Sequence, residues 1–308
     1  MTPTIDDYRR CLPAPYRERA GRVPEADWWR WRDNRIHIAR ARNPDAPARL
    51  LVVHGAGGHS GALWPLVELA VELGFEVIAP DLPGYGRTEV ADPAGIRYSD
   101  WLDCLHDFIQ WEAAKDRRPL VLLGASMGGM LVYSTVARLD QEGAEVPVTA
   151  LVVTCLLDPR DDRVWSALSP WAGRWGLGVM DRLAPLLDRR RVPIRWLTPM
   201  SRIANNPALS RLCCRDKRGG GGRIPIGFLR DFLHSVPPLE PEAFRRVPVL
   251  MTHPAEDRWT PPALSLPFFQ RIAAPREYVP LPEGGHFPAE ATALDALSDT
   301  LRRLLPTG

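Results

Sequence analysis

Short runs of apolar residues alternate with longer amphipathic stretches along most of this chain. Runs of about four to eight apolar residues are typical of strands buried on both faces, whereas apolar positions three and four apart are typical of helices. The runs predict strands at residues 50–53, 75–79, 120–123 and 150–157, and the amphipathic stretches predict helices at 62–73, 98–114 and 127–139. This alternation predicts an α/β fold with a mostly parallel central sheet and helices on both faces.

The alternation stops after residue 157 and returns near residue 247. The second part predicts strands at 248–252 and 277–280 and helices at 261–272 and 289–305. Between the two parts lie helical fragments and many prolines, and no apolar run there resembles a strand. Because a structureless loop of this length is uncommon in a compact domain, we expect an inserted helical lid at residues 158–246. The core then comprises residues 1–157 and 247–308.

Two further segments are defined by prolines and glycines. Residues 1–27 contain four prolines and predict an irregular N-terminal lead-in, which is followed by a hairpin at 28–41 around Asp33 and Asn34. Within the predicted lid, the four consecutive glycines at 219–222 are interpreted either as a hinge that gates entry or as a surface loop.

Composition narrows the classes of protein to which the chain belongs. The sequence has 308 residues with a hydrophobic fraction of 45% and a net charge of +2, so it can bury a large core and nothing in its charge predicts a nucleic-acid partner. Its five cysteines form no paired framework, and its acidic N-terminus does not resemble a signal sequence. No apolar stretch approaches the roughly 18 residues of a membrane span. We therefore expect a cytoplasmic protein without a membrane span; these features leave its oligomeric state open.

The pentapeptide Gly124-Ala125-Ser126-Met127-Gly128 lies between the predicted strand at 120–123 and the predicted helix at 127–139. A serine in this position is held on a sharp strand-to-helix turn that exposes its hydroxyl at the edge of the sheet. The turn requires residues as small as glycine at 124 and 128 so that the strand and the helix can approach each other. The pattern predicts Ser126 as a nucleophile.

An acid and a histidine follow later predicted strands. Asp257 comes shortly after the strand at 248–252, and His286 follows the strand at 277–280. The carboxyl ends of parallel strands meet at one edge of a sheet, and the chain order Ser, Asp, His is one of the orders known for a catalytic triad. Glu256 and Asp158 are alternatives for the acid. No cluster of metal-ligand residues was found, so we expect neither a metal nor another cofactor.

Because of these three residues and their order, the sequence resembles the α/β-hydrolase superfamily. Within it, the sequence resembles the branch of serine esterases and lipases that carry a lid. The resemblance runs from about residue 35 to the C-terminus and is carried by His54-Gly55-Ala56-Gly57-Gly58, Asp81-Leu82-Pro83-Gly84-Tyr85-Gly86, the serine pentapeptide and Gly285-His286. It implies an oxyanion hole made by the backbone N–H groups of Met127 and Ala56, with that of Gly57 as the next candidate.

Candidate substrate-binding residues are His59, Tyr85 and the lid residue Trp165. A surface position for His59 and a small-core role for Trp165 remain open.

The nucleophile narrows the reaction that the resemblance implies. Relatives that cleave haloalkanes or epoxides use an aspartate in place of Ser126, whereas serine indicates acyl transfer. We expect hydrolysis of a small-molecule carboxylic ester, or of a thioester or lactone, by Ser126, Asp257 and His286. The alternatives with the same triad are acyl transfer, perhydrolysis and C–C bond hydrolysis. An alternative of another class is a small-molecule receptor with little or no turnover.

Overall fold

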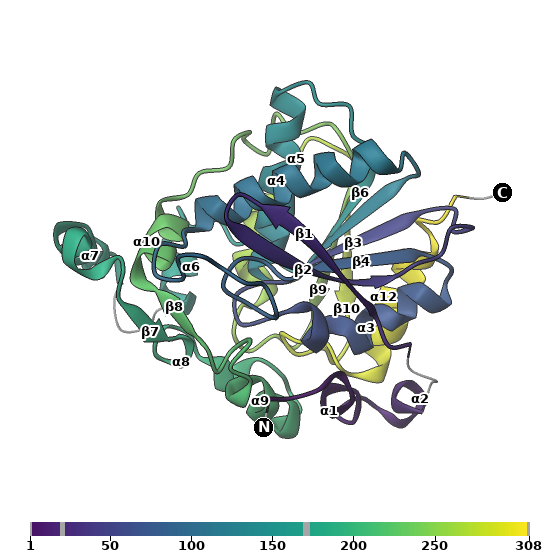
Figure 1. The fold of residues 1–308 in the computed structure, drawn as a ribbon, viewed down its shortest axis with the longest axis horizontal. Coiled ribbons are helices and arrows are strands. Elements are labelled where there is room, and N and C mark those ends of the chain that lie inside the picture. Colours follow the sequence, from purple (N-terminus) through teal and green to yellow (C-terminus); the bar gives the residue numbers. More distant parts are fainter. Residues whose placement is uncertain (1, 19–21, 169–172, 307–308) are drawn as a thin grey trace.

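The computed structural model describes residues 2–18, 22–168 and 173–306. Its centre is an eight-stranded sheet with the order β1-β2-β4-β3-β5-β6-β9-β10 (Figure 1). The strands are β1 (Glu25–Trp31), β2 (Asn34–Ala41), β3 (Arg49–Val53), β4 (Glu76–Pro80), β5 (Leu120–Gly124), β6 (Val148–Val153), β9 (Val249–Pro254) and β10 (Arg276–Leu281).

The sheet is antiparallel at one edge and parallel elsewhere. β1 and β2 form the predicted hairpin, and β2 also pairs with β4 in the antiparallel direction. All other pairs, from β4 through β3, β5, β6 and β9 to β10, are parallel. β3, β4 and β5 are buried along their whole length, which explains their continuous apolar runs. The predicted α/β class and mostly parallel sheet are confirmed.

Helices cover both faces of this sheet (Figure 1). One face carries α4 (Tyr98–Lys115) and α5 (Met127–Gln141), which contact each other. The opposite face carries α3 (Ser60–Glu72) and α12 (Ala291–Arg302), which also contact each other. The predicted helix at 261–272 is instead a 3₁₀ turn, η2 (Pro262–Leu264), followed by the short α11 (Leu266–Arg271). In the described part of the chain, no helix is both long and apolar enough to span a membrane.

The segment between β6 and β9 is called the insertion here and comprises residues 158–246. Its elements are α6 (Asp162–Leu168), α7 (Gly173–Leu187), β7 (Arg191–Pro193), α8 (Ile194–Leu197), η1 (Met200–Arg202), α9 (Pro207–Arg215), β8 (Arg223–Pro225) and α10 (Ile226–His234). The sequence predicted no strand in this region, and the antiparallel β7–β8 pair corrects that prediction. Each of these strands has three residues, of which one is proline, so neither forms a recognisable apolar run.

The N-terminal segment, predicted to be irregular, contains two short helices, α1 (Ile5–Arg9) and α2 (Ala14–Arg17). α1 begins with a capping box in which Thr4 and Asp7 satisfy each other's backbone N–H groups. This helix contacts α3 of the core and α9 of the insertion. The segment therefore connects the core to the insertion.

A buried carboxylate joins these three parts of the molecule. The Tyr8 hydroxyl of α1 donates to Asp216 Oδ2 at 2.8 Å, and His59 Nε2, at the start of α3, lies 2.8 Å from the same oxygen. Asp216 is fully buried at the end of α9. Burial alone raises the pKa of Asp216, but the hydrogen bond and charge of His59 outweigh it and hold this pKa below its usual range.

We expect Asp216→Ala to lower the free energy of unfolding by about 3 kcal/mol or more, because two buried donors lose their acceptor. Urea denaturation at neutral pH measures this change. Asp92→Ala is the matched control, because Asp92 is exposed and pairs only with exposed Arg189 among the described charged groups; its effect should be much smaller.

The folded-state pKa of Asp216 lies below its unfolded value. The contribution of this carboxylate to the free energy of unfolding is therefore fully present above about pH 4 and is lost as the pH falls further.

Equal losses in the free energy of unfolding for Asp216→Ala and Asp92→Ala at neutral pH would show that this carboxylate does not join the three segments.

Candidate active site

Ser126 occupies the tight turn between β5 and α5, with a φ of +55° and a ψ of −126°. A positive φ is unfavourable for a residue other than glycine and costs of order 1–3 kcal/mol. The turn is possible because its neighbours lack side chains. A Cβ on Gly124 would lie 2.3 Å from the carbonyl oxygen of Gly128, and a Cβ on Gly128 would lie 2.4 Å from that of Val53. Both contacts are with backbone, so the glycine requirement seen in the sequence has a steric cause.

Hydrogen bonds to neighbouring strands fix the backbone of this turn. The Ser126 N–H donates to Thr154 Oγ1 at 2.8 Å, and the Ala125 N–H donates to the Val53 carbonyl at 2.9 Å. Thr154 directly follows β6, and its own N–H donates to the Gly124 carbonyl at 3.0 Å. Sequence reasoning missed Thr154 because it lies inside an apolar run that was interpreted as strand up to residue 157. The chain leaves the sheet at residue 153, and the run continues because residues 155–157 are buried beside the site.

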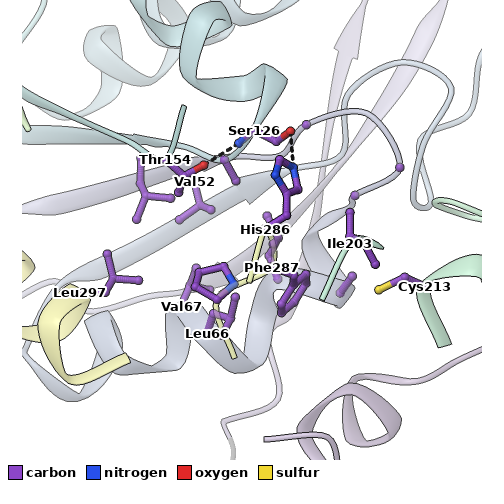
Figure 2. A pocket seen from close by; sticks show the side chains of 18 of the residues that line it. Val52, Leu66, Val67, Ser126, Thr154, Ile203, Cys213, His286, Phe287 and Leu297 are labelled. Carbon is purple, nitrogen blue, oxygen red and sulfur yellow. Dashed lines mark hydrogen bonds between the residues drawn. The ribbon is translucent and has the colours of Figure 1, made fainter. Parts of the chain in front are cut away.

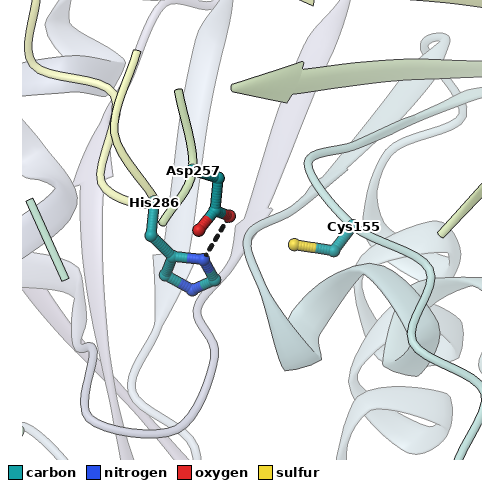
Figure 3. Close-up of side chains that lie close together, drawn as sticks. All are labelled: Cys155, Asp257 and His286. Atoms are coloured by element: carbon teal, nitrogen blue, oxygen red, sulfur yellow. Dashed lines mark hydrogen bonds and ion pairs between the residues drawn. The ribbon is translucent and has the colours of Figure 1, made fainter. Parts of the chain in front are cut away.

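The structure brings Ser126, His286 and Asp257 into one chain of hydrogen bonds. Ser126 Oγ lies 2.8 Å from His286 Nε2 (Figure 2). His286 Nδ1 lies 2.8 Å from Asp257 Oδ2 on the other side of the ring (Figure 3). With the proton on Nδ1, the imidazole donates to the carboxylate and accepts from the serine hydroxyl. Asp257 and His286 are buried, and Ser126 is partly exposed, so the open end of the chain is the hydroxyl.

The Asp257 carboxylate is held by its own loop. The N–H groups of Trp259 and Thr260 both donate to Oδ1 at 2.8 Å, and the Thr260 hydroxyl donates to Oδ2 at 2.8 Å. Burial raises the pKa of Asp257, but the charge and hydrogen bond of His286, with the bonds from Thr260, outweigh it and lower this pKa below its usual value. Asp257 is therefore ionised at neutral pH. Sequence reasoning missed Thr260; the available signal was Asp257 itself, because an Asp side chain often accepts backbone N–H groups a few residues later in its own loop.

The two alternative acids lie in other surroundings. Asp158 accepts hydrogen bonds from the backbone and guanidinium of Arg160, which also binds Glu240. Glu256 is exposed. The geometry therefore favours Asp257 over both alternatives as the partner of His286.

The loop after β3 packs directly on the serine turn. A Cβ on Gly55 would lie 2.7 Å from the Ala125 carbonyl and 2.9 Å from Ser126 Cβ, so only glycine permits this approach. Within the described residues, the backbone N–H groups of Ala56 and Met127 have no hydrogen-bond acceptor. These are the two groups expected to bind an oxyanion, and the Gly55 contact brings their loops together.

The insertion touches this loop through its glycine run. A Cβ on Gly219 would lie 2.5 Å from the Gly57 carbonyl, and a Cβ on Gly220 would lie 2.4 Å from the Met200 side chain. None of the four glycines at 219–222, all described, has a positive φ. The backbone contact leaves no room for a side chain at Gly219, and Gly219 and Gly220 are buried, so the run packs against Gly57 and is not a surface loop; its role as a hinge stays a prediction.

Two predicted substrate-binding residues lie outside the cavity at Ser126. His59 is turned to Asp216, as described above, and Tyr85 packs against the rings of His54 and Trp101, with centroids 5.5 and 5.4 Å away. Both side chains pack inside the protein against other residues and do not face the cavity. This arrangement does not support the prediction that they bind substrate. The side chain of Trp165 lies outside the described residues.

The cavity beside Ser126 has a volume of about 80 Å³ and is lined mainly by apolar side chains (Figure 2). Ser126, Thr154 and His286 supply its polar side chains. Gly55, Ala56 and Gly57 also line it, so the expected oxyanion loop faces the same space as the serine. An acyl group placed there would contact both the nucleophile and the free backbone donors.

Cys155, Asp257 and His286 are the one group of metal-ligand residue types that lie close together in the described part of the chain, with ligand atoms within 4.8 Å of one another (Figure 3). Burial raises the pKa of the Cys155 thiol to about 12, so it stays protonated and is a poor ligand. Asp257 and His286 are already hydrogen-bonded to each other. This donor set fits a proton relay better than a metal site.

Two bacterial proteins are similar in sequence to this chain. Phospholipase YtpA of Bacillus subtilis is 24% identical over 231 residues, which cover 74% of this chain and 82% of that protein. The uncharacterized protein YfhR of Escherichia coli is 29% identical over 99 residues, which cover 32% of this chain and 34% of that protein, so the match spans about a third of that relative's length.

A solved structure shows the same fold. The soluble variant of monoglyceride lipase from Saccharomyces cerevisiae superposes with a TM-score of 0.74 at 18% identity, covering 95% of this chain and 98% of that chain. The model of the alpha/beta hydrolase family matches residues 50–300, which include the serine turn, Asp257 and His286. The chain therefore belongs to the alpha/beta hydrolase family.

Proposed function

We propose that this protein hydrolyses carboxylic esters through an acyl-enzyme on Ser126. The observation that carries the proposal is the position of His286, with one ring nitrogen 2.8 Å from the Ser126 hydroxyl and the other 2.8 Å from the Asp257 carboxylate. A serine hydroxyl is a poor nucleophile until a base takes its proton, and this arrangement supplies the base and the group that orients it.

In the acylation step, Ser126 Oγ attacks the ester carbonyl carbon and His286 Nε2 takes the hydroxyl proton. Asp257 stabilises the imidazolium that forms. The backbone N–H groups of Ala56 and Met127 bind the oxyanion of the tetrahedral intermediate. The intermediate collapses when the C–O bond to the alcohol breaks and Nε2 gives its proton to the leaving oxygen.

Deacylation repeats these steps with water as the nucleophile. His286 takes a proton from water while the water oxygen attacks the acyl carbon, and the proton then returns to Ser126 Oγ as the acid leaves. The net reaction consumes one ester and one water and yields one acid and one alcohol. Thioesters and lactones suit the same residues, because each presents an acyl carbon and a leaving group that Nε2 can protonate.

Relatives support ester chemistry in particular. The Bacillus subtilis relative is named a phospholipase, and the yeast protein of similar fold is a monoglyceride lipase; both names describe enzymes that act on esters of lipids. For this chain we propose a small-molecule ester as substrate.

We also propose that the insertion acts as a lid. Among its described residues, Ile203 and Cys213 line the cavity next to the catalytic residues.

The cysteines bear on where the protein is found. All five are free, including the adjacent Cys213 and Cys214, which fits a reducing compartment such as the cytoplasm.

A fluorophosphonate probe tests the proposed nucleophile. We expect stoichiometric labelling of Ser126, located by peptide mass spectrometry, together with hydrolysis of short p-nitrophenyl esters. Ser126→Ala should abolish both while the melting temperature stays near that of the wild type, because alanine keeps the Cβ and only the hydrogen bond of the hydroxyl to His286 is lost. Absence of labelling would refute the hydrolase function. Labelling without turnover of any ester would favour the slow-turnover receptor.

The acid is tested by a matched pair of substitutions. Asp257→Asn should lower kcat on the order of 10⁴-fold, because an asparagine cannot hold the required tautomer of His286. Asp158→Asn removes a charge from a carboxylate bound to Arg160 and should leave kcat near wild type. Steady-state kinetics on one ester measures both, and a larger loss in Asp158→Asn would show that the acid is Asp158.

A further inference from the structure

The cavity at Ser126 extends into the core of the protein. Its far walls are formed by Leu50 of β3, Val67 of α3 and Leu301 of α12, none of which belongs to the insertion. Among described residues, the insertion contributes only Ile203 and Cys213. Figure 2 shows Leu66, Val67 and Leu297 on the side of the cavity away from Ser126. The space is a slot between one face of the sheet and the two helices that cover it.

The register of the sheet shows how deep this slot is. Val52 of β3 pairs with Leu123 of β5, so their side chains lie on the same face, together with that of Leu50. Leu50 lies three residues before the carboxyl end of β3, which at the strand rise corresponds to roughly 10 Å.

The two covering helices run along the same depth. α3 lines the slot from Ala62 to Val67, and α12 lines it with Leu297 and Leu301, so each helix follows the slot for more than one turn.

Polar side chains lie only at the open end of this slot in the described structure. Ser126, His286 and Thr154 face the cavity at the carboxyl edge of the sheet, and Thr154 Oγ1 already accepts the Ser126 N–H. The side chains farther in are Leu and Val. A charged or hydroxyl group placed there would lose its water and find no partner, which costs several kcal/mol.

We propose that the slot is the acyl site and that it selects esters of linear, unbranched, apolar acids of medium chain length. This inference rests on the proposed ester hydrolysis and names its substrate class. The acyl chain runs from Ser126 between the sheet, α3 and α12, and the alcohol remains on the side of Ile203 and Cys213.

The first test compares p-nitrophenyl esters from acetate to dodecanoate. For the wild type, kcat/KM should rise with chain length to a maximum at a medium chain and then fall. A branched acid of equal carbon number and an acid with a terminal carboxylate should each be at least about tenfold worse than the linear acid.

Filling the slot should change this preference. Val67→Phe places a ring in the deep part, so the ratio of octanoate to acetate kcat/KM should fall at least about tenfold. Val71→Phe is the matched control, since Val71 lies one turn farther along α3 and does not line the cavity. Its ratio should equal that of the wild type, and circular dichroism verifies that both variants are folded.

Enlarging the slot gives an independent readout. Leu297→Ala should move the optimum to longer acyl chains. Leu294→Ala is the same change at a buried position of α12 that does not line the cavity, and it should leave the optimum unchanged.

If no ester is hydrolysed and Ser126 is not labelled, the proposed function fails and the acyl site fails with it. If esters are hydrolysed but Val67→Phe and Leu297→Ala have the same chain-length profile as their controls, the slot alone is refuted.

Discussion

The whole site depends on a steric constraint, the close approach of backbones around Ser126. Added Cβ atoms on Gly124, Gly128 and Gly129 would lie 2.1–2.4 Å from carbonyl oxygens of neighbouring segments. Such contacts cannot be relieved by rotating a side chain, because both sides are backbone. The glycines allow α5 to begin directly at the end of β5, and this in turn holds Ser126 at its positive φ. The same kind of contact at Gly55 brings the oxyanion loop against the turn.

Buried polar groups then fix the loops that surround this turn. His54 accepts the Leu82 N–H at Nε2 and donates from Nδ1 to the Gly55 carbonyl, which joins the loops after β3 and β4. Burial lowers the pKa of His54 to about 4, so it stays neutral and can make both bonds at neutral pH. Asp81 accepts N–H groups of Ser60 and Arg87 and thereby holds the start of α3. The site is therefore positioned by groups that take no part in the chemistry we propose.

The sequence predicts mainly those parts of the fold that residues close together along the chain determine. Runs such as 50–53 are apolar because the strand is buried on both faces, and the glycines beside Ser126 are specified by one tight turn. Asp257 and His286 follow strands, and parallel topology alone brings them to one edge of the sheet. Thr4 and Asp7 form a capping box, which is also a local signal for the start of α1.

Other features depend on contacts between distant residues, which a sequence pattern does not contain. His59 turns to Asp216, 157 positions later, and the glycines at 219–222 pack on a loop near residue 57. The three-residue strands β7 and β8 are stabilised by each other. The direction of the cavity follows from the way α3 and α12 cover the sheet, which is a contact between segments far apart along the chain.

The most direct test is a crystal structure of the protein after reaction with a p-nitrophenyl octylphosphonate, whose phosphorus mimics the tetrahedral carbon. We predict phosphorus bonded to Ser126 Oγ, a phosphoryl oxygen within hydrogen-bond distance of the Ala56 and Met127 N–H groups, and the alkyl chain between β3, α3 and α12. An alkyl chain under the insertion, or phosphorus on another residue, would contradict this account.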